Sequence, residues 1–280
     1  MEVTRRRAGW RYVSVAVRHV APRKPFDSQT RRDECCLVLL RGRCRVEYDG
    51  AVAVLGPRRD VFLDYPHALY LPTHSRFRVV ALEPTELADG RAPARRHALA
   101  ATSRGADAGL VPRARVIRPE DCGFEIRGGA NATRQIVDIM PPGFPADRLM
   151  VCEVFTPSGN WSSYPPHKHD TDQPPTEVKL EEIYYYRFGH TDGYGLQRLY
   201  DTRRDQTVLV RHGDVVVIRR GYHPFVAAYG YDAYYLNVLA GTRRSMAASD
   251  DPRYAAFRAW PPPDSRLPVV APPSGGADGT

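Results

Sequence analysis

Prolines and glycines interrupt this chain so often that few stretches are long enough for a helix. The 280 residues include 25 prolines and 22 glycines, and hardly any stretch between them keeps a 3.6-residue apolar period. Instead, short runs rich in valine, tyrosine, leucine and isoleucine recur, as is typical of strands. Many short strands separated by turns predict an all-β sandwich or barrel. The runs are Trp10–Val17, Cys36–Leu40, Cys44–Tyr48, Ala68–Leu71, Phe77–Leu82, Met150–Thr156, Glu182–Phe188, Leu196–Tyr200, Thr207–Val210, Val215–Ile218 and Ala233–Leu239.

A weak internal repeat divides the chain into two halves. In each half an acidic residue opens an apolar run, Glu34 in the first and Glu182 in the second. The same four elements follow in each half: a glycine turn, a second strand, another glycine turn, and a strand that ends in a loop. We therefore expect two barrels, at residues 1–100 and 101–260, with residues 88–107 as a surface connection that is partly helical. The proline-rich residues 261–280 are expected to form a flexible tail.

The composition argues against several classes of protein. No apolar run reaches the ~18 residues of a membrane span, and the N-terminus does not read as a signal peptide. The net charge is +8, but arginines and acidic residues are mixed, whereas a nucleic-acid-binding surface would cluster the basic ones. Five cysteines without a CxxC pair or secretory signal favour reduced thiols in the cytoplasm. We expect no membrane or nucleic-acid partner, and an anionic small molecule would be attracted by the charge.

Histidines concentrate at one place in the second half. His167 and His169 are two apart, so on a strand they point to the same side. Glu182 begins the next run and His223 lies on a later one. Three imidazoles and one carboxylate converging inside a barrel would bind a divalent transition metal and leave positions for water or substrate. Zinc suits these ligands; manganese, iron or nickel would also fit.

Two alternatives accompany this prediction. An HxH pair by itself also fits two surface histidines, and only the ordered set with the later glutamate and histidine is specific. Glu181 could replace Glu182 as the carboxylate ligand. We prefer Glu182 because its spacing to Gly189 matches a barrel strand and its turn.

Longer segments resemble the cupin superfamily and, within it, its uronate isomerase family. The match is dense between residues 128 and 241 and loose in the first hundred residues. It rests on PSGNWSSYPPHKHDTD (157–172), LEEIYYYRF (180–188), GYGLQRLY (193–200), RRGYHP (219–224), YDAYYLNVLAG (231–241), GANATRQI (129–136) and PADRLMVCEV (145–154).

The resemblance implies a bicupin, that is, two tandem jelly-roll barrels with short helical or loop connections. The metal site would lie in the C-terminal barrel. Here twelve residues, 170–181, separate the HxH pair from Glu182, more than in generic cupins, and we expect them to form a loop at the barrel mouth. The first barrel has no HxH before Glu34, and Arg76 stands where His223 would. We expect it to be metal-free and to serve a structural or dimerisation role in a homo-oligomer.

The implied activity is a metal-dependent aldose–ketose isomerisation of a sugar acid. The leading expectation is conversion of 5-deoxy-glucuronate to 5-dehydro-2-deoxygluconate in myo-inositol catabolism. The alternatives are isomerisation of 5-keto-4-deoxyuronate by a sibling enzyme, oxidation by an iron-dependent cupin dioxygenase, and non-catalytic sugar sensing. The bound cation would stabilise the enediolate oxygens, and a general base would move the proton.

Candidate catalytic residues follow from strand alternation. Tyr184 and Tyr186 share the face of Glu182, where either could donate to the enediolate or simply pack the barrel. Arg198, within a barrel strand, could bind the uronate carboxylate with its guanidinium fork. An outward side chain would instead make it a solvated edge residue. Arg134 and Arg127 are the alternatives.

Overall fold

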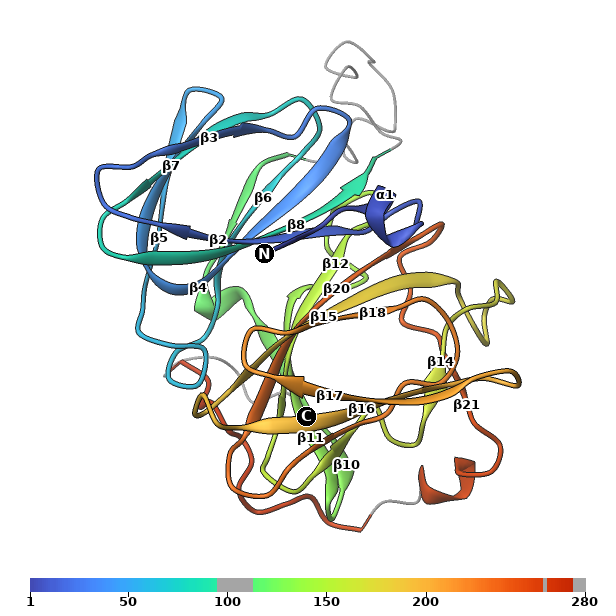
Figure 1. Ribbon diagram of the computed structural model, residues 1–280. Coiled ribbons are helices and arrows are strands. Elements are labelled where there is room, and N and C mark those ends of the chain that lie inside the picture. Colours follow the sequence, from blue (N-terminus) through green and yellow to red (C-terminus); the bar gives the residue numbers. More distant parts are fainter. Residues whose placement is uncertain (95–112, 259–260, 274–280) are drawn as a thin grey trace. The chain divides into compact units, whose positions relative to one another are not determined.

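The computed structural model describes residues 1–94, 113–258 and 261–273, and its regular structure is almost entirely antiparallel β (Figure 1). Helical elements in these ranges are the short α1 (Arg5–Ala8) and the 3-10 turns η2 (Pro119–Asp121) and η3 (Ala255–Arg258). None of the described helices is long and apolar enough to cross a membrane. The all-β prediction is confirmed, in the form of several antiparallel sheets.

The chain forms two compact units. Unit 1 is built from Met1–Cys122 and Ile139–Val151, and unit 2 from Gly123–Asp138 and Cys152–Ala271. The expected domain boundary at residue 100 lies outside the described residues and stays a prediction.

Unit 1 is one nine-stranded sheet that bends over its own core. One path runs β1 (Glu2–Val3), β2 (Ser14–Val20), β8 (Thr85–Pro93), β4 (Asp33–Tyr48), β6 (His67–Leu71) and β9 (Arg115–Ile117). The far end of β4 pairs with β5 (Ala51–Arg58) and β7 (Arg76–Ala81), and β7 pairs with β3 (Phe26–Gln29). Buried side chains from both ends of β4, such as Leu37 and Val46, enter the same core.

A bulge in β4 explains why two predicted strands are one. The register of β4 shifts at Leu39/Arg41 and again at Gly42/Cys44, so the strand bends without ending. Gly42 has φ +96°, and a Cβ there would lie 2.4 Å from the carbonyl oxygen of Pro84. Only glycine fits this bend.

Unit 2 consists of two larger sheets and one strand pair. The six-stranded sheet has the order β10 (Gly123–Gly129), β11 (Ala132–Met140), β12 (Met150–Thr156), β20 (Ala233–Gly241), β15 (Leu180–Phe188) and β18 (Val215–Ile218). The four-stranded sheet has the order β13 (Trp161–Ser162), β19 (Phe225–Ala227), β16 (Tyr194–Tyr200) and β17 (Asp205–Arg211). The pair is β14 (His167–Lys168) with β21 (Ser249–Asp250).

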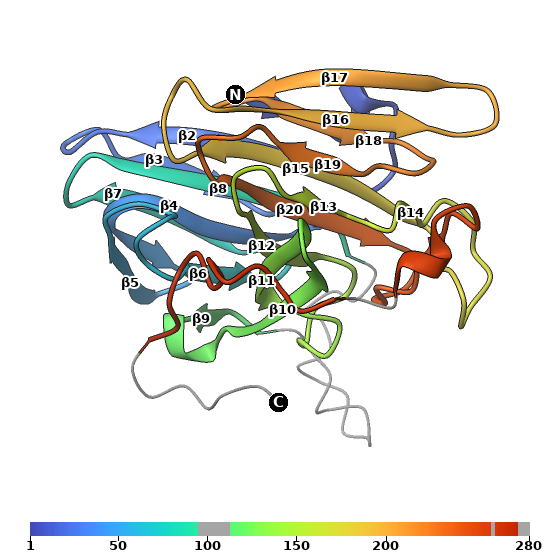
Figure 2. The same cartoon turned by 90° about the horizontal axis from the view of Figure 1, so that it is seen from below.

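The two larger sheets of unit 2 enclose one core. Figure 2 shows β16, β17 and β19 as a layer over β12, β15 and β20. The core takes Tyr184, Tyr186 and Phe188 from β15 and Phe225 from β19. Because side chains alternate along a strand, β15 directs Glu182 to the same interior as these aromatic rings.

Two expectations about connecting segments need revision. Residues 88–93 do not belong to a surface connection: they lie in β8, which pairs with β2 and β4 and is largely buried. The rest of that expected connection, from residue 95 onward, is outside the described residues. At the C-terminus, Val270 is buried, and its backbone N–H and carbonyl both bond the side-chain amide of Gln135. Described residues of the expected tail are therefore attached to β11.

Candidate metal centre

Three of the four predicted metal ligands converge inside unit 2. His169 follows β14, Glu182 lies in β15, and His223 comes just before β19. Their ligand atoms all lie within 4.8 Å of one another, and all three residues are buried. The carboxylate Oε2 of Glu182 is 2.8 Å from Nε2 of His169 and 3.2 Å from Nε2 of His223.

Hydrogen bonds on the far side of each ring orient the two imidazoles. Nδ1 of His169 lies 3.2 Å from the carbonyl oxygen of Leu180, and Nδ1 of His223 lies 3.0 Å from that of Gly221. A carbonyl only accepts, so in both rings Nδ1 carries the proton. Nε2 of each ring therefore faces the Glu182 carboxylate, and Nε2 of His169 lies within hydrogen-bond distance of it at 2.8 Å. A bound cation would take the place of the proton between these atoms. Metal-ligating histidines are oriented by outer partners in this way.

The arrangement is unfavourable without a cation. Nε2 of His223 is buried and makes no hydrogen bond, despite its closeness to Glu182. Two nitrogen lone pairs and a carboxylate oxygen facing one another repel unless a proton or a metal ion lies between them. The donor set of two imidazoles and one carboxylate suits a divalent transition metal. The residues present therefore fit the predicted group.

The pKa shifts in the cluster have the same origin. Burial would raise the pKa of Glu182, but the two histidines outweigh it and hold that pKa well below the usual value. Burial lowers the pKa of His169, yet the Glu182 charge and hydrogen bond raise it overall. The pKa of His167 is well below its ordinary value because of burial and the neighbouring charges of His223 and Arg134.

His167, the fourth predicted ligand, lies beside this group. Its ring centroid is 4.8 Å from that of His223 and 6.3 Å from that of His169. It is half-buried in β14, whereas the other three are buried. Its role as a ligand stays a prediction. The rival Glu181 alternates to the other face of β15.

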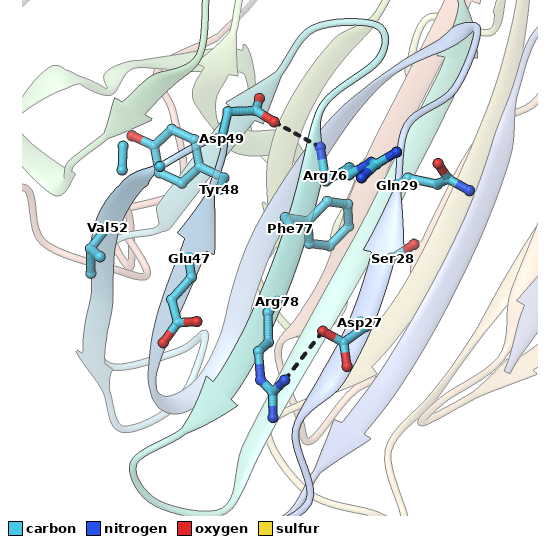
Figure 3. A pocket seen from close by; sticks show the side chains of 12 residues that line it. Asp27, Ser28, Gln29, Glu47, Tyr48, Asp49, Val52, Arg76, Phe77 and Arg78 are labelled. Atoms are coloured by element: carbon cyan, nitrogen blue, oxygen red, sulfur yellow. Dashed lines mark hydrogen bonds and ion pairs between the residues drawn. The ribbon is translucent and has the colours of Figure 1, made fainter.

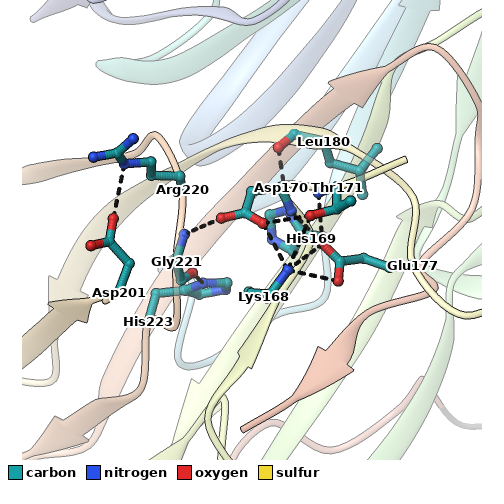
Figure 4. A network of polar contacts seen from close by, with 10 residues as sticks. All are labelled: Lys168, His169, Asp170, Thr171, Glu177, Leu180, Asp201, Arg220, Gly221 and His223. Carbon is teal, nitrogen blue, oxygen red and sulfur yellow. Dashed lines mark hydrogen bonds and ion pairs between the residues drawn. The ribbon is translucent and has the colours of Figure 1, made fainter. Parts of the chain in front are cut away.

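A polar network joins the two segments that carry the imidazoles (Figure 4). Lys168 Nζ bonds both carboxylate oxygens of Glu177 at 2.9 Å and Oδ1 of Asp170 at 2.8 Å. The other oxygen of Asp170 accepts from the backbone N–H of Gly221 at 2.8 Å. Because Asp170 adjoins His169 and Gly221 is two residues before His223, this network sets the spacing of the two rings.

The two tyrosines of β15 have different surroundings. The Tyr184 hydroxyl lies 3.2 Å from Oγ of Ser163, and its ring centroid is 6.2 Å from that of His223. The Tyr186 hydroxyl donates to Oε1 of Gln197 at 2.5 Å. Burial, followed by neighbouring charges, raises the pKa of both tyrosines well above the ordinary value. Both are therefore donors at neutral pH.

Gln197, which the sequence reasoning missed, takes the inward position expected for Arg198. Its amide nitrogen donates to the backbone carbonyl of His223 at 2.7 Å, and the residue is buried. Arg198 turns to the other side of β16, where it contacts Asp205 at 2.8 and 2.6 Å and lies over the Tyr200 ring. The period-two pattern could have found this only with the register of β16 known.

The two alternative arginines lie on opposite members of one strand pair. Arg127 of β10 and Arg134 of β11 are register partners. Arg127 is exposed and pairs with Glu125. Arg134 is only 4% exposed, and its Nη1 has no hydrogen-bond partner.

A large open cavity of about 800 Å³ lies on unit 1, over β3, β4, β5 and β7 (Figure 3). Its polar residues satisfy one another: Arg78 pairs with Asp27 at 3.7 Å, and Asp49 accepts from the backbone N–H of Arg76 at 2.9 Å. Among the described residues of its lining, no three metal-ligating side chains converge. The cavity therefore does not compete with the buried cluster as a metal centre.

Residues 1–257 match the model of the KduI/IolB family. The chain belongs to this family. Similar KduI/IolB relatives include the 5-deoxy-glucuronate isomerase of Geobacillus kaustophilus (strain HTA426), 41% identical over 256 residues, which covers 90% of this chain and 88% of the relative. The 5-deoxy-glucuronate isomerase of Bacillus subtilis (strain 168) is 34% identical over 258 residues, 90% of each chain. The resemblance to uronate isomerases is thus confirmed.

Solved structures agree on the fold. An IolB-like protein from Salmonella typhimurium LT2 is 33% identical, with a TM-score of 0.83 over 92% of this chain and 94% of that one. An oxalate decarboxylase from Lactobacillus farciminis has a TM-score of 0.63 at 12% identity, covering 91% of this chain and 84% of that chain. The second likeness concerns the fold alone.

Proposed function

We propose that this protein is a metal-dependent isomerase that converts 5-deoxy-glucuronate to 5-dehydro-2-deoxygluconate. The names of its curated relatives, which align over 90% of the chain, support this substrate. The observation that carries the metal dependence is the convergence of His169 and His223 on the Glu182 carboxylate, with Nε2 of both rings turned inward. His167 completes the proposed ligand set.

The metal would supply Lewis-acid stabilisation of the carbonyl and the adjacent hydroxyl of the open-chain sugar. Zinc fits the nitrogen-rich donors, and manganese, iron or nickel would fit too. Gln197 and Asp170 hold the backbone on either side of His223 and so keep the imidazole aimed at Glu182. Their hydrogen bonds would limit rearrangement during turnover.

Tyr184 is the proposed donor to the oxygen that becomes negative in the enediolate. Its raised pKa keeps the hydroxyl protonated, so it can donate a hydrogen bond but cannot act as the base. Its protein partner is one Ser163 hydroxyl at 3.2 Å, a long contact that substrate could replace. Tyr186 is instead bonded to Gln197, and we assign it to positioning that amide.

The wider proposal concerns fold, assembly and cellular setting. In each unit, the strand that carries the buried glutamate pairs with an antiparallel strand on either side. In unit 1 this strand is β4, between β8 and β6, and in unit 2 it is β15, between β20 and β18. This parallel supports a bicupin in which unit 1 is a metal-free structural or dimerisation module of a homo-oligomer. All five cysteines are buried thiols outside any disulfide, which fits the proposed cytoplasmic setting in myo-inositol catabolism.

Product analysis tests this function. Metal-loaded protein, incubated with 5-deoxy-glucuronate and followed by NMR, should form the 2-ketose, and chelated protein should not. Parallel incubation with 5-keto-4-deoxyuronate separates the sibling activity. No product from 5-deoxy-glucuronate, with turnover of the other substrate, would contradict the proposal. Turnover that requires oxygen would point to a dioxygenase.

A further inference from the structure

Arg134 is a buried cation that has no carboxylate partner among the described residues. The residue is 4% exposed, Nη1 has no hydrogen bond, and no carboxylate of the described ranges forms an ion pair with it. A buried arginine elsewhere is satisfied: Arg58 of unit 1 donates to the carbonyls of Leu39 at 2.8 Å and Asp64 at 3.0 Å. Burying an unpaired guanidinium is unfavourable. Within the described part of the chain nothing neutralises this charge, and a bound anion would do so.

The side chain faces the same interior as the metal cluster. Ile136, two residues further along β11, belongs to the core that contains Tyr184 and Tyr235, so strand alternation directs Arg134 there as well. Its positive charge opposes the rise that burial causes in the pKa of Tyr235, whose ring lies 4.2 Å from that of Tyr184, and the Tyr184 ring is 6.2 Å from that of His223. Arg134 therefore lies within electrostatic reach of the cluster.

The core that Arg134 faces also contains hydroxyl groups, which suit a sugar. Ser162 Oγ lies 3.0 Å from the Tyr235 hydroxyl, and Ser163 Oγ lies 3.2 Å from that of Tyr184. The two tyrosine rings are 4.2 Å apart. These hydroxyls can exchange their mutual contacts for hydrogen bonds to substrate hydroxyls.

We propose that Arg134 binds the carboxylate of the sugar acid and makes the site selective for uronates. This inference rests on the proposed function. The planar guanidinium matches a carboxylate with two parallel hydrogen bonds. A neutral sugar would leave the buried cation unpaired, which a site built for a charged group penalises strongly.

Substrate discrimination in the metal-loaded protein tests the proposal. The two substrates are 5-deoxy-glucuronate and 5-deoxyglucose, which carries a hydroxymethyl group in place of the carboxylate. We expect Arg134→Met to lower kcat/KM for the uronate by about 100-fold, as for loss of one partner from a buried charge pair. The value for 5-deoxyglucose should change little. Full uronate preference in Arg134→Met would overturn the proposal.

Arg127→Met is the matched control. Arg127 is the register partner of Arg134 but is exposed and paired with Glu125, so its removal should leave the preference for the uronate unchanged. Arg134→Lys keeps the charge and loses the fork, and we expect a loss of about 10-fold. This variant also decides the question if the methionine variant does not fold; wild-type discrimination in the lysine variant would count against bidentate recognition.

A stability measurement separates recognition from a structural role. In chelated protein without substrate, Arg134→Met should melt at the same temperature as wild type or higher, because an unpaired buried charge is removed. A clear drop in melting temperature, with uronate preference retained, would make Arg134 structural.

Calorimetric binding of glucuronate and glucose keeps this proposal separate from the reaction itself. If wild type fails to isomerise 5-deoxy-glucuronate, the proposed function is wrong. Glucuronate binding that is lost in Arg134→Met would still support Arg134 as the carboxylate site. Equal binding of glucuronate and glucose to wild type, or none of either, would overturn it.

Discussion

Glu34 of unit 1 and Glu182 of unit 2 lie near the starts of β4 and β15, and both are almost fully buried. Glu34 is surrounded by donors. Its carboxylate accepts from the backbone N–H groups of Asp147, Arg148 and Leu149 at 2.8, 2.6 and 2.7 Å, and from the Tyr70 hydroxyl at 2.9 Å. Glu182 instead faces two imidazole nitrogens at 2.8 and 3.2 Å.

The comparison shows that the neighbours, rather than the strand position, decide what a buried carboxylate does. Four donors satisfy the Glu34 carboxylate, and three of them are backbone N–H groups, so Glu34 holds residues 147–149 in place. Glu182 faces two imidazole nitrogens that can themselves bind a metal ion, and one of them, Nε2 of His169, is within hydrogen-bond distance of its carboxylate. The three groups can therefore bind a cation together. The arginines differ in the same way: Arg58 is satisfied by carbonyls, and Nη1 of Arg134 is not.

The largest expected effect is on the metal. Glu182→Gln should lower the bound metal to background and reduce isomerase activity by about 10³-fold, because Lewis-acid stabilisation contributes several kcal/mol to the transition state. Metal analysis and steady-state kinetics measure both. Glu181→Gln, one residue away on the other face of β15, is the control. Wild-type metal content in Glu182→Gln would show that Glu182 is not a metal ligand.

Glu34→Gln should affect stability and leave the metal content of the folded protein unchanged. The new amide group would place a donor against backbone donors, and we expect a loss of about 3 kcal/mol in the free energy of unfolding. Urea unfolding measures this loss. The control is Glu47→Gln, a half-buried residue of the same strand that pairs with Arg45. Loss of metal in Glu34→Gln, with little change in stability, would contradict the structural role.

Tyr70 and Tyr184 provide a second comparison between the two units. Tyr70→Phe removes one donor to a buried charge and should cost about 1.5 kcal/mol of stability. Tyr184→Phe should change stability by less than about 1 kcal/mol, because it loses only a contact with a neutral hydroxyl. Its activity should fall about 10-fold or more through loss of a donor to the enediolate. Equal effects of both variants on stability and on activity would argue against a structural role for Tyr70 and a catalytic role for Tyr184.

The smallest effect concerns Asp251, a carboxylate of unit 2 that is satisfied like Glu34. Arg253, and after it the Tyr200 hydroxyl at 2.6 Å, lower its pKa from 3.8 to about 2 against the opposing effect of burial. Because the folded-state pKa is depressed, its stabilisation is present above about pH 4 and disappears as the pH falls toward 2. We expect about 1 kcal/mol, since Arg253 is largely exposed.

Comparison of Asp251→Asn with wild type by urea unfolding at pH 5.5 and pH 2.5 measures this contribution. The difference in unfolding free energy should be present at the higher pH and shrink at the lower one. A difference that grows on acidification would show that Asp251 is not stabilised as a carboxylate.

The candidate group of His169, Glu182 and His223 could be predicted from the sequence because local spacing indicates its chemistry. An HxH pair, a strand that begins with glutamate and a late histidine are recognisable without knowing which strands pair. The predicted runs Met150–Thr156 and Val215–Ile218 coincide with β12 and β18 for a similar reason, since their apolar β-branched residues favour strands by themselves.

Other elements depend on long-range pairing and were missed. Strand β8 reads Thr-Glu-Leu-Ala-Asp-Gly-Arg-Ala-Pro, which has little intrinsic strand preference, and it becomes a strand because β2 and β4 pair with both of its edges. The choice between Gln197 and Arg198 has the same cause. Both are polar, so only the register of β16 with β19 decides which side chain enters the core.

The most direct test of the central claim is a measurement of metal content and activity on the same protein sample. The account predicts about one divalent ion per chain, loss of 5-deoxy-glucuronate isomerisation when a chelator removes that ion, and recovery on stoichiometric readdition. Full activity in protein shown to be metal-free would contradict it.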